Sequence, residues 1–189
     1  IYTLSLHDAL PILEIRFRHP RSNARCRLDW AVPNDKMPDA QRLMERAVND
    51  GTKIFIIQSA DEWSEFIAAN SKVVFKDKFF VGTNWLGGVM FNKPHDIFKE
   101  LPVGNALNWP YQALIHTGVE RMGLVMEGEE LLVGAYHTYP MAIGTAMGIV
   151  PMGKGSVLFS TLDIYGNIIN DSAAGLVAKK LIFNMIDFK

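Results

Sequence analysis

Three small polar residues, Ser160, Thr161 and Asp163, stand directly after a predicted strand. In open α/β sheets, binding and catalytic sites tend to lie at the carboxyl ends of strands. The same residue types also favour turns and helix caps, where their side chains bond to backbone groups. The sequence therefore leaves two interpretations of this cluster, a site at the strand end or a set of caps for the next turn.

A second candidate set combines aromatic rings with amide and imidazole groups, and it comes from three segments rich in predicted loops. Aromatic rings stack on the CH-rich faces of sugars, while amide and imidazole groups bond sugar hydroxyls. Trp and Tyr are also the usual anchors of protein interfaces. We therefore expect either a carbohydrate site or a packing surface, formed by Trp85, Asn108, Trp109, Tyr111, Tyr136, His137 and Tyr139.

The remaining histidines and the single cysteine predict no metal site, no cofactor and no nucleophile. His95, His116 and His137 lie in separate segments, without the spacing of metal ligands. We expect His95 to order its own loop through a backbone hydrogen bond, and His116 to sit in the core or at an edge at the end of a predicted strand. Cys26 has no identifiable histidine partner, and a lone cysteine forms no intrachain disulfide.

The strand before the polar cluster belongs to the segment GTAMGIVPMGKGSVLFSTLD, residues 144–163. Its middle, PMGKG, predicts a turn because Pro fixes φ and Gly adopts the positive φ that tight hairpins require. The flanking runs 146–150 and 157–159 are short, apolar and bounded by Gly and Pro, which is typical of strands. The segment therefore predicts a β-hairpin with one buried face.

Upstream, residues 38–49 carry apolar side chains at helical spacing, and Gly51 fits the end of that helix. Residues 53–57, KIFII, then predict a buried strand, and residues 61–69 a second helix with Trp63, Phe66 and Ile67 on its apolar stripe. A helix, a glycine and a short apolar strand in this order form half of a βαβ unit. This order favours a parallel sheet covered on both faces.

Further short strands are predicted at residues 73–80, 114–116, 123–126 and 131–140, and an amphipathic helix at residues 170–188 closes the chain. Residues 92–102 predict a short helix or turn. The carboxylates Glu127, Glu129 and Glu130 predict a solvated turn. We find no repeat and no linker, so we expect one α/β domain over residues 38–189.

Composition limits the classes of partner. A chain of 189 residues with 49% hydrophobic and 21% charged residues fits one soluble globular domain. Its net charge of −1 gives no electrostatic reason to expect nucleic acid or a membrane as partner. Residues 1–12 resemble a translated sequencing adapter, and we treat residues 13–37 as a truncated lead-in. The arginines of this lead-in leave a basic nucleic-acid-binding arm as an alternative.

Four segments together resemble a known family: NWLGGVMF (84–91), HDIFKELP (95–102), NWPYQ (108–112) and YPMAIGTAMGIVPMGKGSVLFSTLDI (139–164). They are similar to the C-terminal region of certain bacterial glycoside hydrolases of family 2, the group that includes β-galactosidase-like enzymes. That region resembles a class I glutamine-amidotransferase-like domain. The resemblance implies a flavodoxin-like, three-layer α/β fold with a mostly parallel sheet, a C-terminal β-hairpin and a closing helix.

Neither catalytic machinery of these families carries over to this sequence. Retaining glycosidases need two carboxylates about 5 to 5.5 Å apart, which family 2 enzymes hold on a (β/α)8 barrel, and this chain has no such alternation of strands and helices. Amidotransferase chemistry needs a Gly-x-Cys-x-Gly elbow, and the predicted strand after Gly51 leads into Gln58 and Ser59 instead. We expect no catalytic residues of either kind.

The resemblance therefore implies a non-catalytic accessory domain of a family 2-like glycoside hydrolase, which acts on O-glycosidic bonds in carbohydrates. Its partners would be other domains of the parent enzyme, carbohydrate, or a second copy of the chain. Export of the parent to the periplasm or the extracellular space fits enzymes of this kind. Two alternatives remain: a stand-alone hydrolase of the amidotransferase-like superfamily with its site at Ser160, Thr161 and Asp163, and a free carbohydrate-binding module.

Overall fold

The first three elements follow the predicted helix, strand and helix. The computed structural model describes residues 37–57, 60–81, 88–107, 110–116, 122–138 and 141–188, and the predicted lead-in with Cys26 lies outside them. Helix α1 (Met37–Asp50) ends before Gly51, whose φ of +77° suits glycine. Strand β1 (Lys53–Ile56) and helix α2 (Ala60–Ala69) come next. These predictions are confirmed.

The sheet has seven described strands, which are β1, β2 (Val74–Phe80), β3 (Gly88–Asn92), β4 (Met122–Glu127), β5 (Glu130–His137), β6 (Ala142–Met152) and β7 (Gly155–Ser160). Their order is β1-β7-β6-β4-β2, and β5 pairs with β6 and β3 beside this path. Among the described pairs only β1 with β7 is parallel. The predicted mostly parallel sheet is therefore wrong. Short turns join β5 to β6 and β6 to β7, and strands joined in this way pair antiparallel. Strand β4 pairs antiparallel with β2 and β6.

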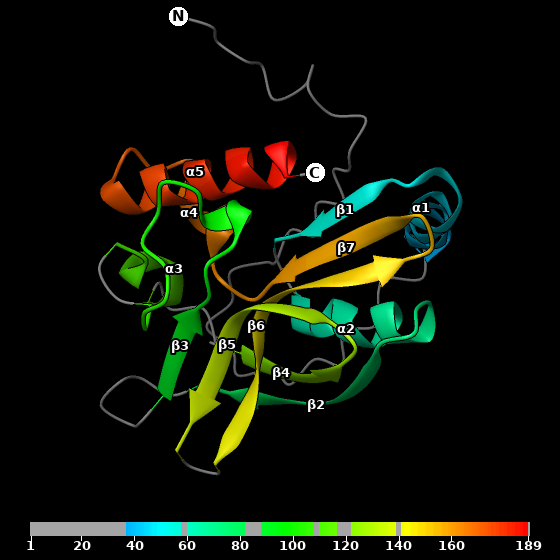
Figure 1. Cartoon of the computed structure of the whole chain (residues 1–189), viewed down its shortest axis with the longest axis horizontal. Helices are drawn as coiled ribbons and strands as arrows, with labels where there is room; N and C mark the ends of the chain where they lie inside the picture. The colour runs from blue at the N-terminus through cyan, green and yellow to red at the C-terminus, as the bar shows by residue number, and fades with distance from the viewer. Residues whose placement is uncertain are drawn as a thin grey trace, which may run out of the picture.

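Strand β6 is the long central element of the sheet. Figure 1 shows it running from its hairpin with β5 to its hairpin with β7. The predicted β6–β7 hairpin is confirmed, but its turn is narrower than expected, because Pro151 belongs to β6 opposite Ser156. The turn proper is Gly153 and Lys154, and Gly153 has a φ of +59°. A side chain on Gly153 would also place Cβ 2.4 Å from the Val48 carbonyl oxygen.

The helices after β3 are short, except for the last. A 3-10 helix, η2 (Asp96–Phe98), lies where a short helix or turn was expected. Residues 114–116 belong to helix α3 (Gln112–His116), so the strand predicted there is wrong. Three residues are too few for hydrophobic spacing to distinguish a strand from a helix. Helix α4 (Ile164–Ile168) follows β7 unpredicted, and α5 (Ala173–Asp187) confirms the closing helix.

Two hydrophobic clusters lie on the two faces of the sheet. One contains residues of α1 and α2, and the other contains residues of η2, α3, α4 and α5. Strand β7 contributes to both, because Val157 belongs to the first cluster and its neighbour Leu158 to the second. The chain is therefore a mixed α/β fold with a mostly antiparallel sheet. None of the described helices is long and apolar enough to cross a membrane.

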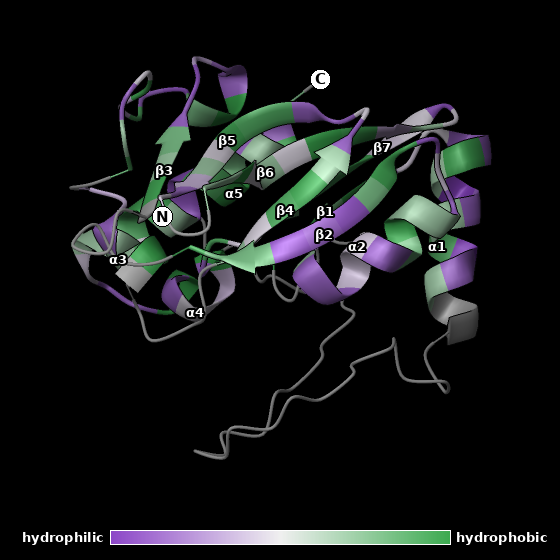
Figure 2. Ribbon diagram, turned by 90° about the horizontal axis from the view of Figure 1, so that it is seen from below, coloured by the Kyte–Doolittle hydropathy of each residue, from purple (hydrophilic) through white to green (hydrophobic). Residues whose placement is uncertain are grey.

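The edge strand β2 is charged along its middle. Lys76, Asp77 and Lys78 are exposed there, and Figure 2 shows this stretch as strongly hydrophilic. Lys76 pairs with Glu127, and Lys78 Nζ lies 3.2 Å from an Asp61 carboxylate oxygen. Charged side chains, lysine above all, protect an edge strand from pairing with another strand.

Candidate functional site

Two hydroxyls of the strand-end cluster bond to the backbone of the chain. Ser160 is buried at the end of β7, and its Oγ accepts a hydrogen bond of 3.2 Å from the Leu162 N–H. The Thr161 hydroxyl lies 2.8 Å from the Met122 carbonyl oxygen and 3.2 Å from that of Ala146. It thereby ties the end of β7 to β4 and β6.

Asp163 caps the next helix. Its Oδ1 accepts a hydrogen bond of 2.9 Å from the Gly166 N–H, as an N-cap residue does in the first turn of a helix. Its second oxygen lies 3.4 Å from Asn167 Nδ2. The structure thus gives all three residues of the cluster a role in closing β7 and starting α4.

Tyr111 lies in the core. Its side chain is buried, and its hydroxyl donates a hydrogen bond of 2.7 Å to the Pro102 carbonyl and accepts one of 3.4 Å from Asn92 Nδ2. Its ring meets that of Phe98 edge-on, with centroids 6.4 Å apart. Burial disfavours the phenolate and raises the pKa of Tyr111 to about 12, although the hydrogen bond from Asn92 acts in the opposite direction. Its ring face is not available to a sugar in solution.

Tyr136 and His137 are neighbours on β5 and therefore point to opposite faces of the sheet. Tyr136 stands between Val89 and Ile143, on the two adjacent strands. His137 stands between Gly88 and Ala142, two positions with little side chain. Its Nδ1 is buried and has no hydrogen-bond partner among the described residues, which marks it as a polar atom that a further group would satisfy.

The other four members of the aromatic set, Trp85, Asn108, Trp109 and Tyr139, lie outside the described residues. The described residues that flank them are neighbours. Gly88 pairs with His137, and the Leu107 N–H donates a hydrogen bond of 2.6 Å to the Met90 carbonyl, two residues along β3. The chain segments that carry the four residues therefore leave the described fold close to one another, around the start of β3.

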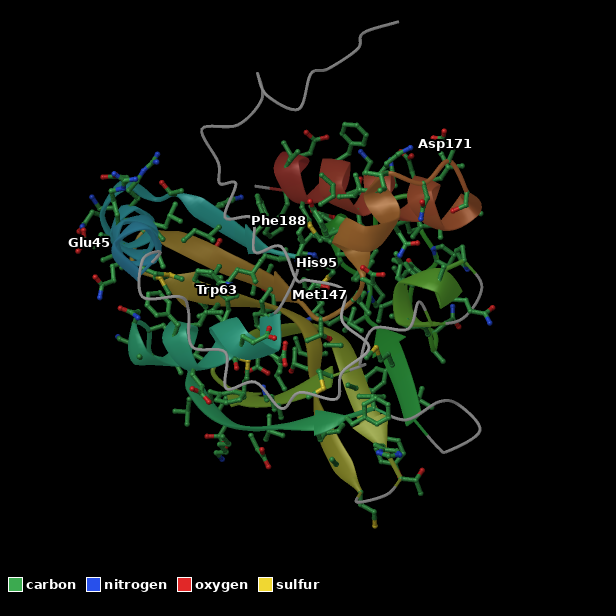
Figure 3. All side chains as sticks on the ribbon, turned by 180° about the vertical axis from the view of Figure 1, so that it is seen from behind. Glu45, Trp63, His95, Met147, Asp171 and Phe188 are labelled. Carbon is green, nitrogen blue, oxygen red and sulfur yellow. The ribbon has the colours of Figure 1, made fainter. Side chains whose placement is uncertain are left out.

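His95 orders its own loop, as predicted. Its Nδ1 accepts a hydrogen bond of 3.2 Å from the Ile97 N–H and so caps η2. Its ring lies 4.9 Å from that of Phe188, and its Nε2 lies 3.8 Å from a Glu130 carboxylate oxygen. Figure 3 labels His95 and Phe188 next to each other. These contacts join η2 to the end of α5. His116 ends helix α3, so its predicted place at a strand end is wrong.

The carboxylates between β4 and β5 form the predicted turn. Gly128 has a φ of +95° at its centre. Glu127 pairs with Lys76, and Thr145 Oγ1 donates a hydrogen bond of 2.7 Å to a carboxylate oxygen of Glu129. The residues that the structure describes contain no group of three acids, histidines or cysteines that could hold a metal ion.

Sequence analysis missed an apolar surface formed by three adjacent strands, which we call the β3–β5–β6 face. It consists of two rows, Val89–Tyr136–Ile143 and Phe91–Gly134–Thr145. Phe91 is 41% exposed and Ile143 68% exposed. The only signal for these rows in the sequence is apolar alternation, and it cannot show which side of a sheet lacks a covering helix.

Comparison with known proteins gives a distant similarity to a solved structure. The structure is similar to that of a cold-adapted β-galactosidase from Rahnella sp. R3, with a TM-score of 0.44 and 9% sequence identity. The match covers 78% of this chain and 20% of the other, so the chain spans about a fifth of that enzyme's length. No protein-family model and no curated protein matches the chain. A similarity this distant carries no argument about what the chain does.

Proposed function

We propose that this chain is a non-catalytic accessory domain of a glycoside hydrolase related to family 2, and that it supports the enzyme by packing against other protein surfaces. The four sequence segments that resemble that family support the parent enzyme's class. The observation that carries the accessory role is the use of polar side chains: Tyr111, Ser160, Thr161 and Asp163 all bond to the chain itself. Apolar side chains, in contrast, remain exposed on the β3–β5–β6 face.

The amidotransferase-like part of the proposal rests on fewer features. The succession of β1, α2 and the closing helix α5 fits such a domain, as does the parallel pairing of β1 with β7. The antiparallel majority of the sheet departs from it. We therefore propose a relationship to this fold group only for the part of the sheet that contains β1 and β7.

Turnover assays test the accessory role. The purified chain is incubated with nitrophenyl glycosides and, separately, with glutamine, and product is followed over hours. We expect no turnover above a heat-denatured control. Turnover that Asp163→Ala abolishes, with the circular dichroism spectrum unchanged, would refute the accessory role and establish the stand-alone hydrolase.

A second candidate function is carbohydrate binding at the start of β3, and the unpartnered, buried Nδ1 of His137 favours it. Because this nitrogen is buried, a sugar hydroxyl would reach it only after its surroundings open; Gly88 and Ala142, which stand on either side of His137, carry little side chain that could block the hydrogen bond. Trp85 and Trp109 belong to segments that flank this point and would supply stacking surfaces.

Calorimetric titration with galacto-oligosaccharides tests this second function. We expect saturable heat that disappears in Trp109→Ala and His137→Ala. The matched control is Tyr165→Ala, which removes an exposed ring on α4 and should bind normally. Heat that is absent from the unmodified chain, or retained in both variants, excludes the site.

A further inference from the structure

The β3–β5–β6 face has no charged residue at its row positions, and Phe91 and Ile143 are exposed on it, whereas Gly134 and Thr145 are buried. In the ladder, Val89, Tyr136 and Ile143 lie opposite one another on one side of the sheet. The alternate positions, such as Met90 and Ala135, are buried in the core on the other side. The face is therefore the outer surface of a sheet whose inner surface is packed.

The exposed ring of Phe91 covers Gly134, a residue without a side chain on the neighbouring strand β5. A Cβ built on Gly134 would lie 2.3, 2.6 and 2.9 Å from three consecutive ring atoms of Phe91. Three atoms at nearly equal distance mean that the face of the ring, and not its rim, covers the glycine. The ring thus lies along the sheet and leaves a flat surface that a second flat surface can approach closely.

The helices on this side of the sheet pack elsewhere. Helix α1 contacts β1, β6 and β7, and α2 contacts β2 and β4. Figure 1 shows β3 and the hairpin end of β5 and β6 on the side of the molecule away from α1. At the end of that hairpin, Met141 is 77% exposed.

The exposed side chains of the face and the adjoining Met141 supply about half of the area that one partner of a standard interface buries. From their exposed fractions, Phe91, Ile143 and Met141 together expose roughly 400 Å², as large as the greatest apolar patches of most monomers. Each partner of a standard interface buries about 800 Å². Val89, Tyr136 and the rim of the face lie around these three residues and would supply the remainder.

The distribution of charge favours a second copy of this chain as the occupant. A twofold interface brings each residue close to its own counterpart, so a charged face opposes like charges and a neutral one does not. The row positions carry no charge; the carboxylate of Glu129 keeps its charge and accepts a hydrogen bond of 2.7 Å from Thr145, which is itself buried. The other exposed apolar stripe, Leu176 and Phe183 on α5, has Lys179 and Lys180 between its residues.

We propose that the β3–β5–β6 face is a homodimer interface in which two copies stack their apolar rows across a twofold axis. This inference rests on the proposed packing role and names its partner. The inference does not depend on the absence of turnover. The turnover assays can therefore refute the accessory role without refuting the interface, and the sedimentation experiment can refute the interface without refuting the accessory role.

Sedimentation velocity and light scattering of the full chain, over about 1 to 100 µM, test the interface. We expect a monomer–dimer equilibrium in the unmodified chain. Ile143→Asp places a carboxylate in the interface and should raise the dimer dissociation constant at least tenfold. Leu176→Asp is the matched control, since it introduces the same charge at a residue of similar exposure, 64%, on α5. It should leave the dimer unchanged.

Ile143→Thr keeps a β-branched residue on the strand and covers the case in which the aspartate variant fails to fold. It should fold normally and weaken the dimer by a smaller factor. The proposal is overturned by a monomer throughout the concentration range, by a dimer that the folded Ile143 variants leave intact, or by an equal effect of Leu176→Asp.

Discussion

The buried phenol of Tyr111 allows a prediction in which hydrogen bonding and proton linkage can be separated. Tyr111→Phe removes the hydroxyl that donates to the Pro102 carbonyl at 2.7 Å and keeps the ring that packs on Phe98. The Pro102 carbonyl retains a second donor, because Asn92 Nδ2 lies 2.8 Å from it. The cost near neutral pH is therefore that of one ordinary hydrogen bond, about 1 kcal/mol of unfolding free energy.

The pH dependence follows from the raised pKa of Tyr111, about 12 in the folded chain against 10 in the unfolded one. Below about pH 10 the phenol is protonated in both states. Above it, the unfolded chain loses this proton first, so the free energy of unfolding falls until the folded pKa is passed. The loss reaches about 1.4 kcal/mol at pH 11 and at most about 3 kcal/mol beyond the folded pKa. Tyr111→Phe lacks this loss, and the two proteins should be about equally stable near pH 11.

Urea unfolding at intervals between about pH 8 and pH 11 measures both effects. The titration of lysines is common to both proteins and cancels in the difference between them. Tyr165→Phe is the control at pH 8, because this tyrosine is 47% exposed and loss of its hydroxyl should leave the free energy of unfolding unchanged. The reasoning is refuted if the deficit of Tyr111→Phe stays constant with pH, or if the variant equals the unmodified chain at pH 8.

Five further substitutions, at four residues, test other contacts through denaturant unfolding. Asn184→Ala should cost about 2 to 4 kcal/mol, because the buried amide of α5 donates hydrogen bonds of 2.9 Å to two carbonyls of the η2 segment; a cost below about 1 kcal/mol would contradict this. Gly155→Ala should lower the free energy of unfolding by more than about 2 kcal/mol, because its Cβ would lie 2.2 Å from the Thr52 carbonyl oxygen. Gly104→Ala is the control: its Cβ would have no atom within 4 Å, so the free energy of unfolding should fall by about 1 kcal/mol through the φ of +73° alone. Asp163→Ala should cost about 1 kcal/mol through loss of the α4 cap, and Asp163→Asn should restore most of it.

The long helices and the central hairpin follow from the sequence because local signals specify them. In α1, Ala40, Met44 and Ala47 are buried at the spacing of one helix face. In the β6–β7 hairpin, the positive φ at Gly153 is a local requirement that glycine meets. Each signal depends on neighbours within a few residues, so no knowledge of the tertiary structure is needed.

The direction of the sheet is not a local property, and its prediction failed for that reason. A helix, a glycine and an apolar strand indicate a parallel pair, and β1 does pair in parallel with β7. The paired residues, such as Lys53 and Ser156, lie 103 positions apart in the chain, however, so the pattern says nothing about the strands between them. The described pairs that those strands form are antiparallel, whether the partner follows through a short turn, as β6 follows β5, or lies further along the chain, as β4 does from β2.

Whether an aromatic side chain is buried or exposed also depends on tertiary structure that the local sequence does not encode. Phe79 and Phe91 each lie over a glycine of the neighbouring strand, Gly123 and Gly134 respectively. Phe79 covers its glycine on the inner side of the sheet and packs against the core, whereas Phe91 does so on the outer side and remains exposed. The two residues have the same local pattern, a phenylalanine in a short apolar run. Only the register of the ladder and the position of the covering helices decide which ring stabilises the fold and which is free to meet a partner.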